Sequence, residues 1–284
     1  MNPRHAVDLH RGEPHRPCSV IRYCIQSTTV RSVIARDATG DLMTYELFYW
    51  PGIQGRAEFV RLALEEAGAR YLDMAAVPEA QGGGVPAILR VLGTSGVRRP
   101  PFAPPILRAG RQLIAQTPNI LLFLGGPLKL APRDEPGRLW THQLALTILD
   151  FYVEIFDTHH PLGDGYAYEE QKAEAKRRTR YFLAVRLPKF LGYFERVLEL
   201  NGSRRPWMVG ARLSYADLSM AQVIAGLKYA FPSASARTLR RRPRLRALHQ
   251  AVFDRPRIAR YAASGRRLDF NNEDLFRHYP ELDR

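Results

Sequence analysis

Residues 45–58 are Tyr45-Glu46-Leu47-Phe48-Tyr49-Trp50-Pro51-Gly52-Ile53-Gln54-Gly55-Arg56-Ala57-Glu58, and the fold class follows from them. The first six residues are rich in aromatic side chains and predict a β-strand, which Pro51-Gly52 ends. Apolar residues then recur at helical spacing over residues 60–67, and Gly68 stands where a helix commonly ends. This stretch therefore predicts a strand followed by an amphipathic helix.

The sequence downstream adds strands and helices to this unit. Residues 71–74 predict a second strand, joined to the first through a right-handed crossover. Residues 85–92 allow a short helix, and residues 106–115 predict a hairpin with Gly110 in its turn. Thr117-Pro118 then opens a helix that runs through residue 124. The order of these elements predicts an α/β domain over residues 43–126.

Beyond residue 126 the pattern is helical. A connection that contains Pro127, Pro132 and Pro136 marks the boundary between two domains. A capping box at Ser214-Tyr215-Ala216-Asp217 precedes an apolar helix through residue 227. The other predicted helical segments are residues 139–156, 169–200, 244–253 and 256–263. They predict an all-α domain over residues 134–284.

Residues 1–42 show no sustained periodicity, and we predict a disordered extension there. They contain the only two cysteines, Cys18 and Cys24, whose spacing fits no common zinc or redox motif. Two cysteines cannot form a disulfide framework, which favours a reducing compartment, and we expect a cytoplasmic protein. No stretch approaches the roughly 20 apolar residues of a membrane helix, so we expect no membrane association.

The formal net charge of +14 would suit a nucleic-acid-binding protein, because neutralisation of phosphates drives that association. The basic residues are mostly scattered arginines, and the densest groups lie at residues 176–178 and 240–246. Neither group carries the interleaved aromatic residues of a base-stacking surface. We therefore expect solvated helix faces and no nucleic-acid partner. A patch for acidic ligands or surfaces is the alternative.

Residues 45–58 resemble the first strand and helix of tyrosine-type cytosolic glutathione S-transferases, which have a Tyr at the strand end and a Gly-Arg-Ala-Glu-like helix start. Pro105-Ile106-Leu107, Gly110 and Gln116-Thr117 keep that family's spacing from its cis-proline to its Gln-Ser pair. The capping box is also a family feature, and the resemblance extends from residue 43 to the end of the chain. It implies a thioredoxin-like domain of order βαβ-α-ββα, an all-helical second domain, a homodimer and, in our interpretation, a bacterial source.

In that family a tyrosine at the strand end stabilises the glutathione thiolate, and Tyr49 matches it. A free thiol has a pKa of about 8.5, and lowering it by about two units favours the anion by about 2.7 kcal/mol. A hydroxyl that donates to sulfur beside a helix N-terminus supplies interactions of that kind. The alternative for Tyr49 is a core or interface aromatic residue, which we expect Tyr45 to be. Arg56 matches the family arginine behind the active-site loop, or is a helix-surface charge.

Thr117-Pro118 combines a good cap residue with a proline at the helix start, and the free amides there form an anion site. The alternative is a purely structural cap. The resemblance implies that the γ-glutamyl carboxylate of glutathione binds at this end, with Thr117 in place of the family serine and Gln116 bonding the same moiety. Pro105 matches the family cis-proline. Pro104 matches the residue whose backbone binds the cysteinyl part of glutathione, but it has no N–H, so one bond of about 0.5–1.5 kcal/mol is impossible.

Two further features belong to the predicted helices. Asp150 matches an acidic residue that reaches the glutathione of the neighbouring subunit, and is otherwise a solvated helix carboxylate. His159-His160 has no carboxylate or cysteine spaced for metal binding, so we expect a charge at a helix C-terminus and no metal site.

The resemblance implies a detoxifying enzyme that conjugates glutathione, its co-substrate, to small electrophilic apolar substrates. A non-catalytic binding protein of the same fold, with protein or RNA partners, is the first alternative, and Pro104 and the charge of +14 favour it. A glutathione-dependent isomerase or peroxidase is the second alternative, which the sequence does not separate from a transferase.

Overall fold

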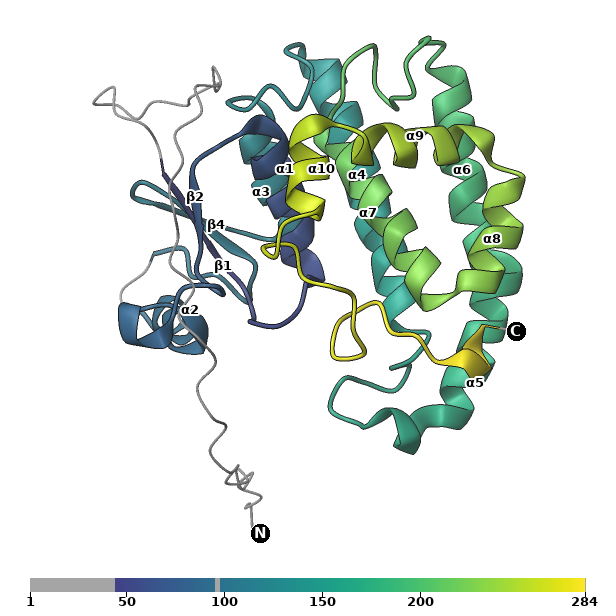
Figure 1. Cartoon of the computed structure of the whole chain (residues 1–284), viewed down its shortest axis with the longest axis horizontal. Coiled ribbons are helices and arrows are strands. Elements are labelled where there is room, and N and C mark those ends of the chain that lie inside the picture. Colours follow the sequence, from purple (N-terminus) through teal and green to yellow (C-terminus); the bar gives the residue numbers. More distant parts are fainter. Residues whose placement is uncertain (1–43, 95–97, 284) are drawn as a thin grey trace. The chain divides into compact units, whose positions relative to one another are not determined.

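The computed structural model describes residues 44–94 and 98–283, and it confirms the strand and helix expected near the start of this range (Figure 1). Strand β1 is Tyr45–Phe48, and the 3-10 turn η1 (Gly55–Ala57) leads into helix α1 (Glu58–Ala67). Gly68 ends α1 with a φ of +67°, a conformation that glycine adopts readily. Strand β2 (Tyr71–Asp73) then pairs parallel to β1, which completes the strand–helix–strand unit.

The sheet has four strands in the order β2-β1-β3-β4. Strands β3 (Ile106–Ala109) and β4 (Gln112–Ala115) form the predicted hairpin, and β3 runs antiparallel to β1. Side chains alternate between the two faces: Leu47 and Leu107 pack on one side, and Phe48 and Ile106 on the other. Helices α1 and α3 (Thr117–Gly125) cover the first face, whereas η2 (Glu79–Gln81) and α2 (Gly84–Leu92) lie on the second (Figure 1).

The rest of the described chain is helical, as predicted. The α-helices are α4 (Glu135–Phe156), α5 (Lys172–Tyr181), α6 (Leu187–Leu200), α7 (Tyr215–Ala230), α8 (Pro232–Arg240), α9 (Pro243–Phe253) and α10 (Pro256–Ala262). Shorter turns are η3 (Tyr168–Gln171), η4 (Phe182–Arg186) and η5 (Pro280–Leu282). The four strands with α1, α2 and α3 form a thioredoxin-like βαβ-α-ββα domain, and the helices from α4 onward form an all-α domain.

The capping box before α7 is confirmed. The carboxylate of Asp217 accepts hydrogen bonds from the Ser214 backbone N–H and hydroxyl, at 2.7 and 2.8 Å, and from the Met208 N–H at 2.7 Å. Asp217 is fully buried, so these donors replace the water that its carboxylate has lost. The cap fixes the start of α7, the central helix, which packs against α1, α4 and α9.

Two helix boundaries differ from the sequence prediction. Helix α4 begins at Glu135, so Pro136 lies in its first turn, where a missing N–H costs nothing, and Asp134 accepts the Gly137 N–H at 2.8 Å. The segment at residues 169–200 is not one α-helix, because the π-helical turn η4 interrupts it. Pro188 follows this turn and cannot donate to a preceding carbonyl, which explains the local change in hydrogen bonding.

Helix α8 was missed. Its sequence, Pro-Ser-Ala-Ser-Ala-Arg-Thr-Leu-Arg, has few large apolar residues and begins with residues that are typical of turns. Only Ala234 and Leu239 provide buried apolar contacts, and Asp283 accepts the backbone N–H groups of Ser233 and Ala234 at 2.7 and 2.9 Å. The helix therefore depends on a cap from a residue about fifty positions later.

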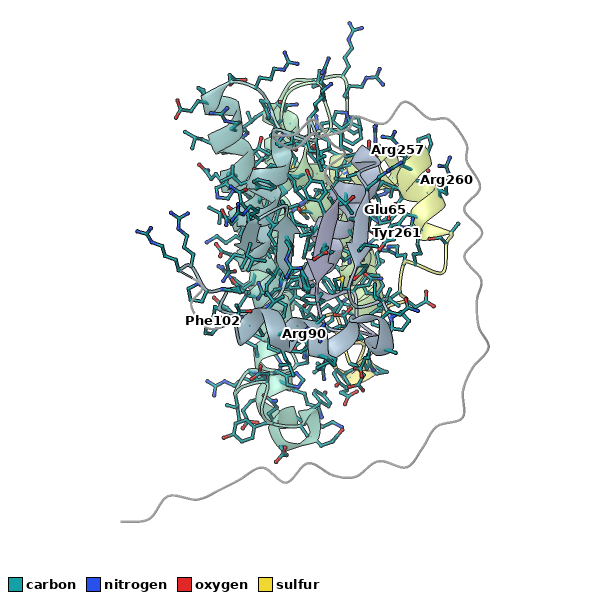
Figure 2. All side chains as sticks on the ribbon, turned by 90° about the vertical axis from the view of Figure 1, so that its left-hand side faces the viewer. Glu65, Arg90, Phe102, Arg257, Arg260 and Tyr261 are labelled. Carbon is teal, nitrogen blue, oxygen red and sulfur yellow. The ribbon has the colours of Figure 1, made fainter. Side chains whose placement is uncertain are left out.

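Helix α1 is held by the C-terminal part of the chain. Glu58 is fully buried and accepts hydrogen bonds from Tyr261 at 3.1 Å and Arg267 at 3.0 Å. Figure 2 shows Tyr261 and Arg257 of α10 beside Glu65 of α1. These contacts lie within one compact unit, which contains all the described residues. The predicted domain limits stay predictions, and the expectations for residues 1–42, Cys18 and Cys24 lie outside the described residues.

Between residues 44 and 283, the described helices lack the combination of length and apolar composition that a bilayer crossing requires.

Candidate active site

Tyr49 directly follows β1, and only 4% of its surface is exposed. Its hydroxyl oxygen accepts a hydrogen bond from the backbone N–H of Arg56 at 2.9 Å. The ring lies against Gly55, where a Cβ atom would stand 2.2 Å from the hydroxyl oxygen, and Gly55 has a φ of +50°. Both the space and the backbone therefore require glycine at this position. The Gly-Arg pair of the motif thus orients the Tyr49 hydroxyl toward the N-terminal end of η1 and α1.

The protonation state of Tyr49 follows from this position. Burial raises the pKa of Tyr49 to about 12, although the Arg56 N–H acts in the opposite direction. The phenol is therefore protonated at neutral pH. Because its oxygen already accepts a bond from Arg56, its proton is available for donation to another acceptor. A protonated and oriented O–H is the group that stabilises a thiolate through a hydrogen bond.

Thr117 joins the same hydrogen-bonded chain from the other side. Its side chain is buried, and its hydroxyl donates to the backbone carbonyl of Arg56 at 3.3 Å. The backbone of Arg56 thus links Tyr49, through its N–H, to Thr117, through its C=O. The expectation that the Thr117 hydroxyl caps α3 is wrong, because Gln116 occupies the cap position and no side chain caps the helix. The structure therefore brings Tyr49, Arg56 and Thr117 together.

Gln116 has an unusual backbone conformation beside this chain. Its φ is +69°, which is uncommon for a residue other than glycine, and its side chain is exposed. Its carbonyl accepts the Ile120 N–H at 2.9 Å and so begins the hydrogen bonding of α3. Strained conformations of this kind cluster at functional sites. The exposed Gln116 amide stands at the N-terminus of α3, where the free backbone N–H groups favour an anion.

The two prolines stand beside the end of β1. The Pro104–Pro105 peptide bond is cis, as the resemblance implied for Pro105. Since Ile106 pairs with Phe48 in the antiparallel register, Pro105 lies next to the strand end that carries Tyr49. Pro105 is buried and Pro104 is half-buried. The carbonyl of Pro104 is therefore the one backbone hydrogen-bonding group that this residue can offer to a ligand.

Asp150 is not part of this group. It lies on the exposed side of α4, whereas Phe151 and Tyr152, which follow it, are buried. Its expected contact with the glutathione of a neighbouring subunit stays a prediction.

Asp274 is a site residue that sequence reasoning missed. Its carboxylate has 1% of its surface exposed and accepts the backbone N–H groups of Gln54 and Gly55, each at 3.0 Å. The side chain of Gln54 also donates to the carbonyl of Leu268. The C-terminal segment therefore holds the loop whose next residue, Arg56, donates to Tyr49. No local pattern marks Asp274, because its partners lie about 220 positions away.

Tyr152 of α4 was also missed. Its hydroxyl is buried and has no hydrogen-bond partner among the described residues, and the Arg56 guanidinium lies 5.4 Å from its ring centroid. Burial, together with the neighbouring charges of Tyr49 and Asp274, raises its pKa well above the ordinary value. In the sequence, Tyr152 was indistinguishable from the other core residues of α4. The structure places an additional protonated hydroxyl in the surroundings of Tyr49.

The His159-His160 pair does not carry the charge expected at the end of α4. His159 is buried, and its Nε2 donates to the Leu275 carbonyl at 2.9 Å while its Nδ1 faces that of His160. Burial lowers the pKa of His159 to about 3 and also lowers that of His160. Both imidazoles are therefore neutral, and His159 anchors the C-terminal segment through the Leu275 carbonyl. Across residues 44–94 and 98–283, no three His, Cys, Asp or Glu side chains are grouped to hold a metal ion.

These features define a class of protein: a thioredoxin-like domain with a buried tyrosine at the end of its first strand, joined to a helical domain. A family model described as "Glutathione S-transferase, C-terminal domain" matches residues 156–265. The glutathione S-transferase of Plasmodium falciparum is 24% identical over 220 residues, which cover 76% of this chain and 93% of that protein. Glutathione S-transferase 2 of Onchocerca volvulus is 26% identical over 220 residues, 77% of this chain and 92% of that one.

Solved structures have the same fold. The structure of prostaglandin synthase D of Nilaparvata lugens superposes with a TM-score of 0.60 at 19% identity, covering 78% of this chain and 98% of the other. The chain thus has the glutathione S-transferase fold, and the sequence matches support the cytosolic glutathione S-transferase family. The tyrosine type stays a prediction. So does the bacterial source, which the two eukaryotic relatives do not support.

Proposed function

We propose that this protein is a glutathione S-transferase in which Tyr49 stabilises the glutathione thiolate. The relatives support glutathione transferase activity in general, with glutathione as the co-substrate. The observation that carries the proposal is the hydroxyl of Tyr49, whose oxygen is occupied by the Arg56 N–H while its proton remains available. A pKa of about 12 keeps that proton in place at neutral pH.

In the proposed reaction the thiol of glutathione loses its proton to solvent, and Tyr49 donates a hydrogen bond to the sulfur anion. The anion attacks an electrophilic carbon, a C–S bond forms, and the leaving group departs with the electron pair of its former bond. Tyr49 stays protonated, so it acts by electrostatic stabilisation and not as an acid. The substrates we propose are small, apolar electrophiles.

Glutathione would be held by the groups around Tyr49. The exposed amide of Gln116 and the start of α3 suit the γ-glutamyl carboxylate, because an anion is favoured at a helix N-terminus. Thr117 would not bond to glutathione through its hydroxyl, because that hydroxyl donates to the Arg56 carbonyl. It would instead help to hold Arg56, whose N–H bonds to Tyr49. The cysteinyl N–H of glutathione would bond to the carbonyl of Pro104, beside Pro105.

We also propose that the protein is a homodimer. Phe102, just before the cis-proline, is 92% exposed and projects next to α2 (Figure 2). On α4, Leu139, Leu146 and Val153 are 63%, 44% and 41% exposed and recur at helical spacing on the side that carries Asp150. A two-fold dimer would let each copy cover the exposed apolar residues of the other, and it would bring Asp150 to the partner's site.

The test begins with glutathione binding by calorimetry, followed by conjugation to a generic aryl halide. Tyr49→Phe should lower turnover at least about tenfold, because one donor to the sulfur contributes more than roughly 1.4 kcal/mol. The pKa of the bound thiol should rise by about one unit or more in the same variant.

Tyr45→Phe is the matched control, because the Tyr45 hydroxyl is buried and unpartnered within the described part of the chain. Equal turnover in the two variants would contradict the assignment of Tyr49.

A non-catalytic glutathione-binding protein is the second candidate, favoured by the missing N–H of Pro104 and by the deep burial of Tyr49. Binding of glutathione without ionisation of its thiol near neutral pH, and without conjugation, would support this candidate. A glutathione-dependent isomerase or peroxidase would instead ionise the thiol but act on a different electrophile.

A further inference from the structure

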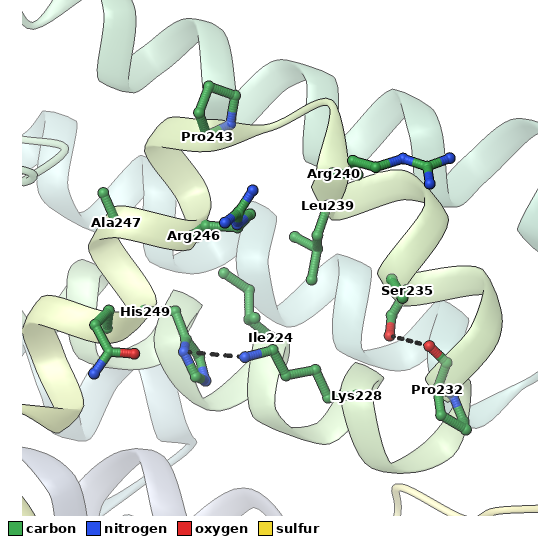
Figure 3. Close-up of a pocket in the computed structure, with 12 residues that line it drawn as sticks. Ile224, Lys228, Pro232, Ser235, Leu239, Arg240, Pro243, Arg246, Ala247 and His249 are labelled. Carbon is green, nitrogen blue, oxygen red and sulfur yellow. Dashed lines mark hydrogen bonds between the residues drawn. The ribbon is translucent and has the colours of Figure 1, made fainter.

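A cavity of about 650 Å³ opens between α7, α8 and α9, and it shares no lining residue with the Tyr49 site (Figure 3). Its apolar floor includes Ile224 of α7 and Leu239 of α8, both buried. This volume falls within the range of about 300–1,000 Å³ that is usual for small-molecule sites. The cavity is therefore large enough for an organic ligand, and nothing in the proposed transferase reaction uses it.

The charged side chains that line the cavity are all basic. Lys228 comes from α7, Arg240 from α8 and Arg246 from α9, and no aspartate or glutamate lines the cavity. None of the three forms an ion pair with a carboxylate among the described residues. The nearby Glu195 instead accepts the backbone N–H groups of Arg244 and Leu245, each at 3.0 Å. The positive charge of the cavity is thus not neutralised by the protein.

Lys228 lies beside His249 in the cavity lining. The Nζ of Lys228 lies 3.4 Å from Nδ1 of His249, an interaction drawn as a dashed line in Figure 3. Burial and the positive charge of Arg246 lower the pKa of Lys228. Burial and the charge of Lys228 lower the pKa of His249 to about 4. His249 is therefore neutral and can only accept from Lys228. An anion between Lys228 and Arg246 would relieve this repulsion.

The chemistry of the lining favours phosphate among the anions. A guanidinium presents a planar set of N–H donors that matches phosphate oxygens, and an ammonium adds a second charge from another direction. The two positive charges of Lys228 and Arg246 match the nearly double negative charge of a phosphate monoester near neutral pH better than the single negative charge of a carboxylate. The Ser235 hydroxyl is bonded to the Pro232 carbonyl, so the cations provide the specificity. The adjoining floor of Ile224 and Leu239 suits an apolar group attached to the phosphate.

We propose that the cavity between α7, α8 and α9 binds a phosphate monoester, with the phosphate between Lys228 and Arg246 and the organic group over Ile224 and Leu239. This site accounts for part of the basic group at residues 240–246, which the transferase reaction leaves unexplained.

Calorimetric titration of the full-length protein with phenyl phosphate tests the proposal, with phenol as the phosphate-free comparison. We expect saturable binding of phenyl phosphate, weakened about tenfold or more in Lys228→Gln and in Arg246→Gln, because each removes a bond to a charged group. Arg237→Gln is the matched control, since Arg237 is an exposed arginine of α8 that does not line the cavity. Glutathione conjugation and melting temperature should be unchanged in all three variants.

Vesicles of phosphatidylcholine, with and without phosphatidic acid, distinguish the two sources of the phosphate. Sedimentation with phosphatidic acid vesicles that is lost in Lys228→Gln supports the site and assigns a lipid headgroup. Binding of phenyl phosphate without such sedimentation supports the site and assigns a soluble monoester. Failure of the parent protein to bind either probe would overturn the proposal. So would binding in Lys228→Gln and Arg246→Gln that equals the binding in Arg237→Gln.

Discussion

Replacement of Asp274 by alanine tests whether the C-terminal segment positions the loop that orients Tyr49. The carboxylate accepts the N–H groups of Gln54 and Gly55, each at 3.0 Å, and Arg56, the next residue, donates to Tyr49. Asp274→Ala leaves these two buried N–H groups without an acceptor. The loop would then lose its main tether to the C-terminal segment, and the Tyr49 hydroxyl would lose its fixed orientation.

The expected loss of stability follows from these two bonds. Burial raises the pKa of Asp274, so the ionised carboxylate itself costs free energy in the folded state, and the low end of the usual range applies. At about 1.5 kcal/mol for each bond to a charged acceptor, Asp274→Ala should destabilise the protein by about 3 kcal/mol. For a protein of this size, that corresponds to a fall in melting temperature of about 6–12 °C.

Thermal unfolding followed by circular dichroism measures this change, and the ultraviolet absorbance of the thiolate measures the pKa of bound glutathione. We expect that pKa to rise in Asp274→Ala, because the donor to sulfur is no longer held. Glu273→Ala is the control, since Glu273 is the exposed neighbour on the same segment. If Asp274→Ala and Glu273→Ala unfold at the same temperature and ionise glutathione equally, the positioning role of Asp274 is refuted.

Three further predictions use different assays. Gly55→Ala should unfold at a lower temperature and conjugate glutathione more slowly than the control Gly52→Ala. Both glycines have a positive φ, but only at Gly55 would the new Cβ atom collide with Tyr49. Equal effects of the two substitutions would show that the protein relieves the collision. The free energy of unfolding should fall as the pH drops from about 6.5 toward 3, and His159 should account for up to about 1.4 kcal/mol of this fall per pH unit. The reason is that His159 takes up a proton in the unfolded chain, whereas the buried imidazole, with its pKa of about 3, does not. Chemical denaturation of His159→Gln should show a flatter pH dependence, and an unchanged slope would count against neutral burial. Phe102→Ser should weaken self-association in sedimentation velocity, whereas Leu200→Ser, which alters another exposed apolar residue, should not; a parent protein that is monomeric would contradict the dimer.

Much of the fold was predictable because its signals are local. The aromatic strand, the apolar spacing of α1 and the glycine that ends it all act within a few residues, as does the capping box at Ser214–Asp217. Helix α8 was not predictable in this way, since its cap comes from Asp283. The π-helical turn η4 was missed because the apolar period continues through it.

The candidate site was predictable in part. The resemblance to a known family implied that Tyr49, Arg56 and Thr117 belong to one site, and the structure joins them through the backbone of Arg56. The sequence did not show what the Thr117 hydroxyl bonds to, because a hydroxyl at a helix start can cap the helix or reach a neighbouring carbonyl. In this structure the Thr117 hydroxyl bonds to the neighbouring Arg56 carbonyl and does not cap the helix.

The sequence by itself predicted the order of the strands and helices over residues 45–124, the helical character of the second domain and the tyrosine at the strand end. Only the tertiary structure showed that Asp274 holds the tyrosine loop, that Tyr152 adds a buried hydroxyl and that His159 is neutral. The physical reason is one of range. Periodicity and turn chemistry act over a few residues, whereas burial and long-range hydrogen bonds, which set protonation and orientation, depend on segments that meet only when the chain is folded.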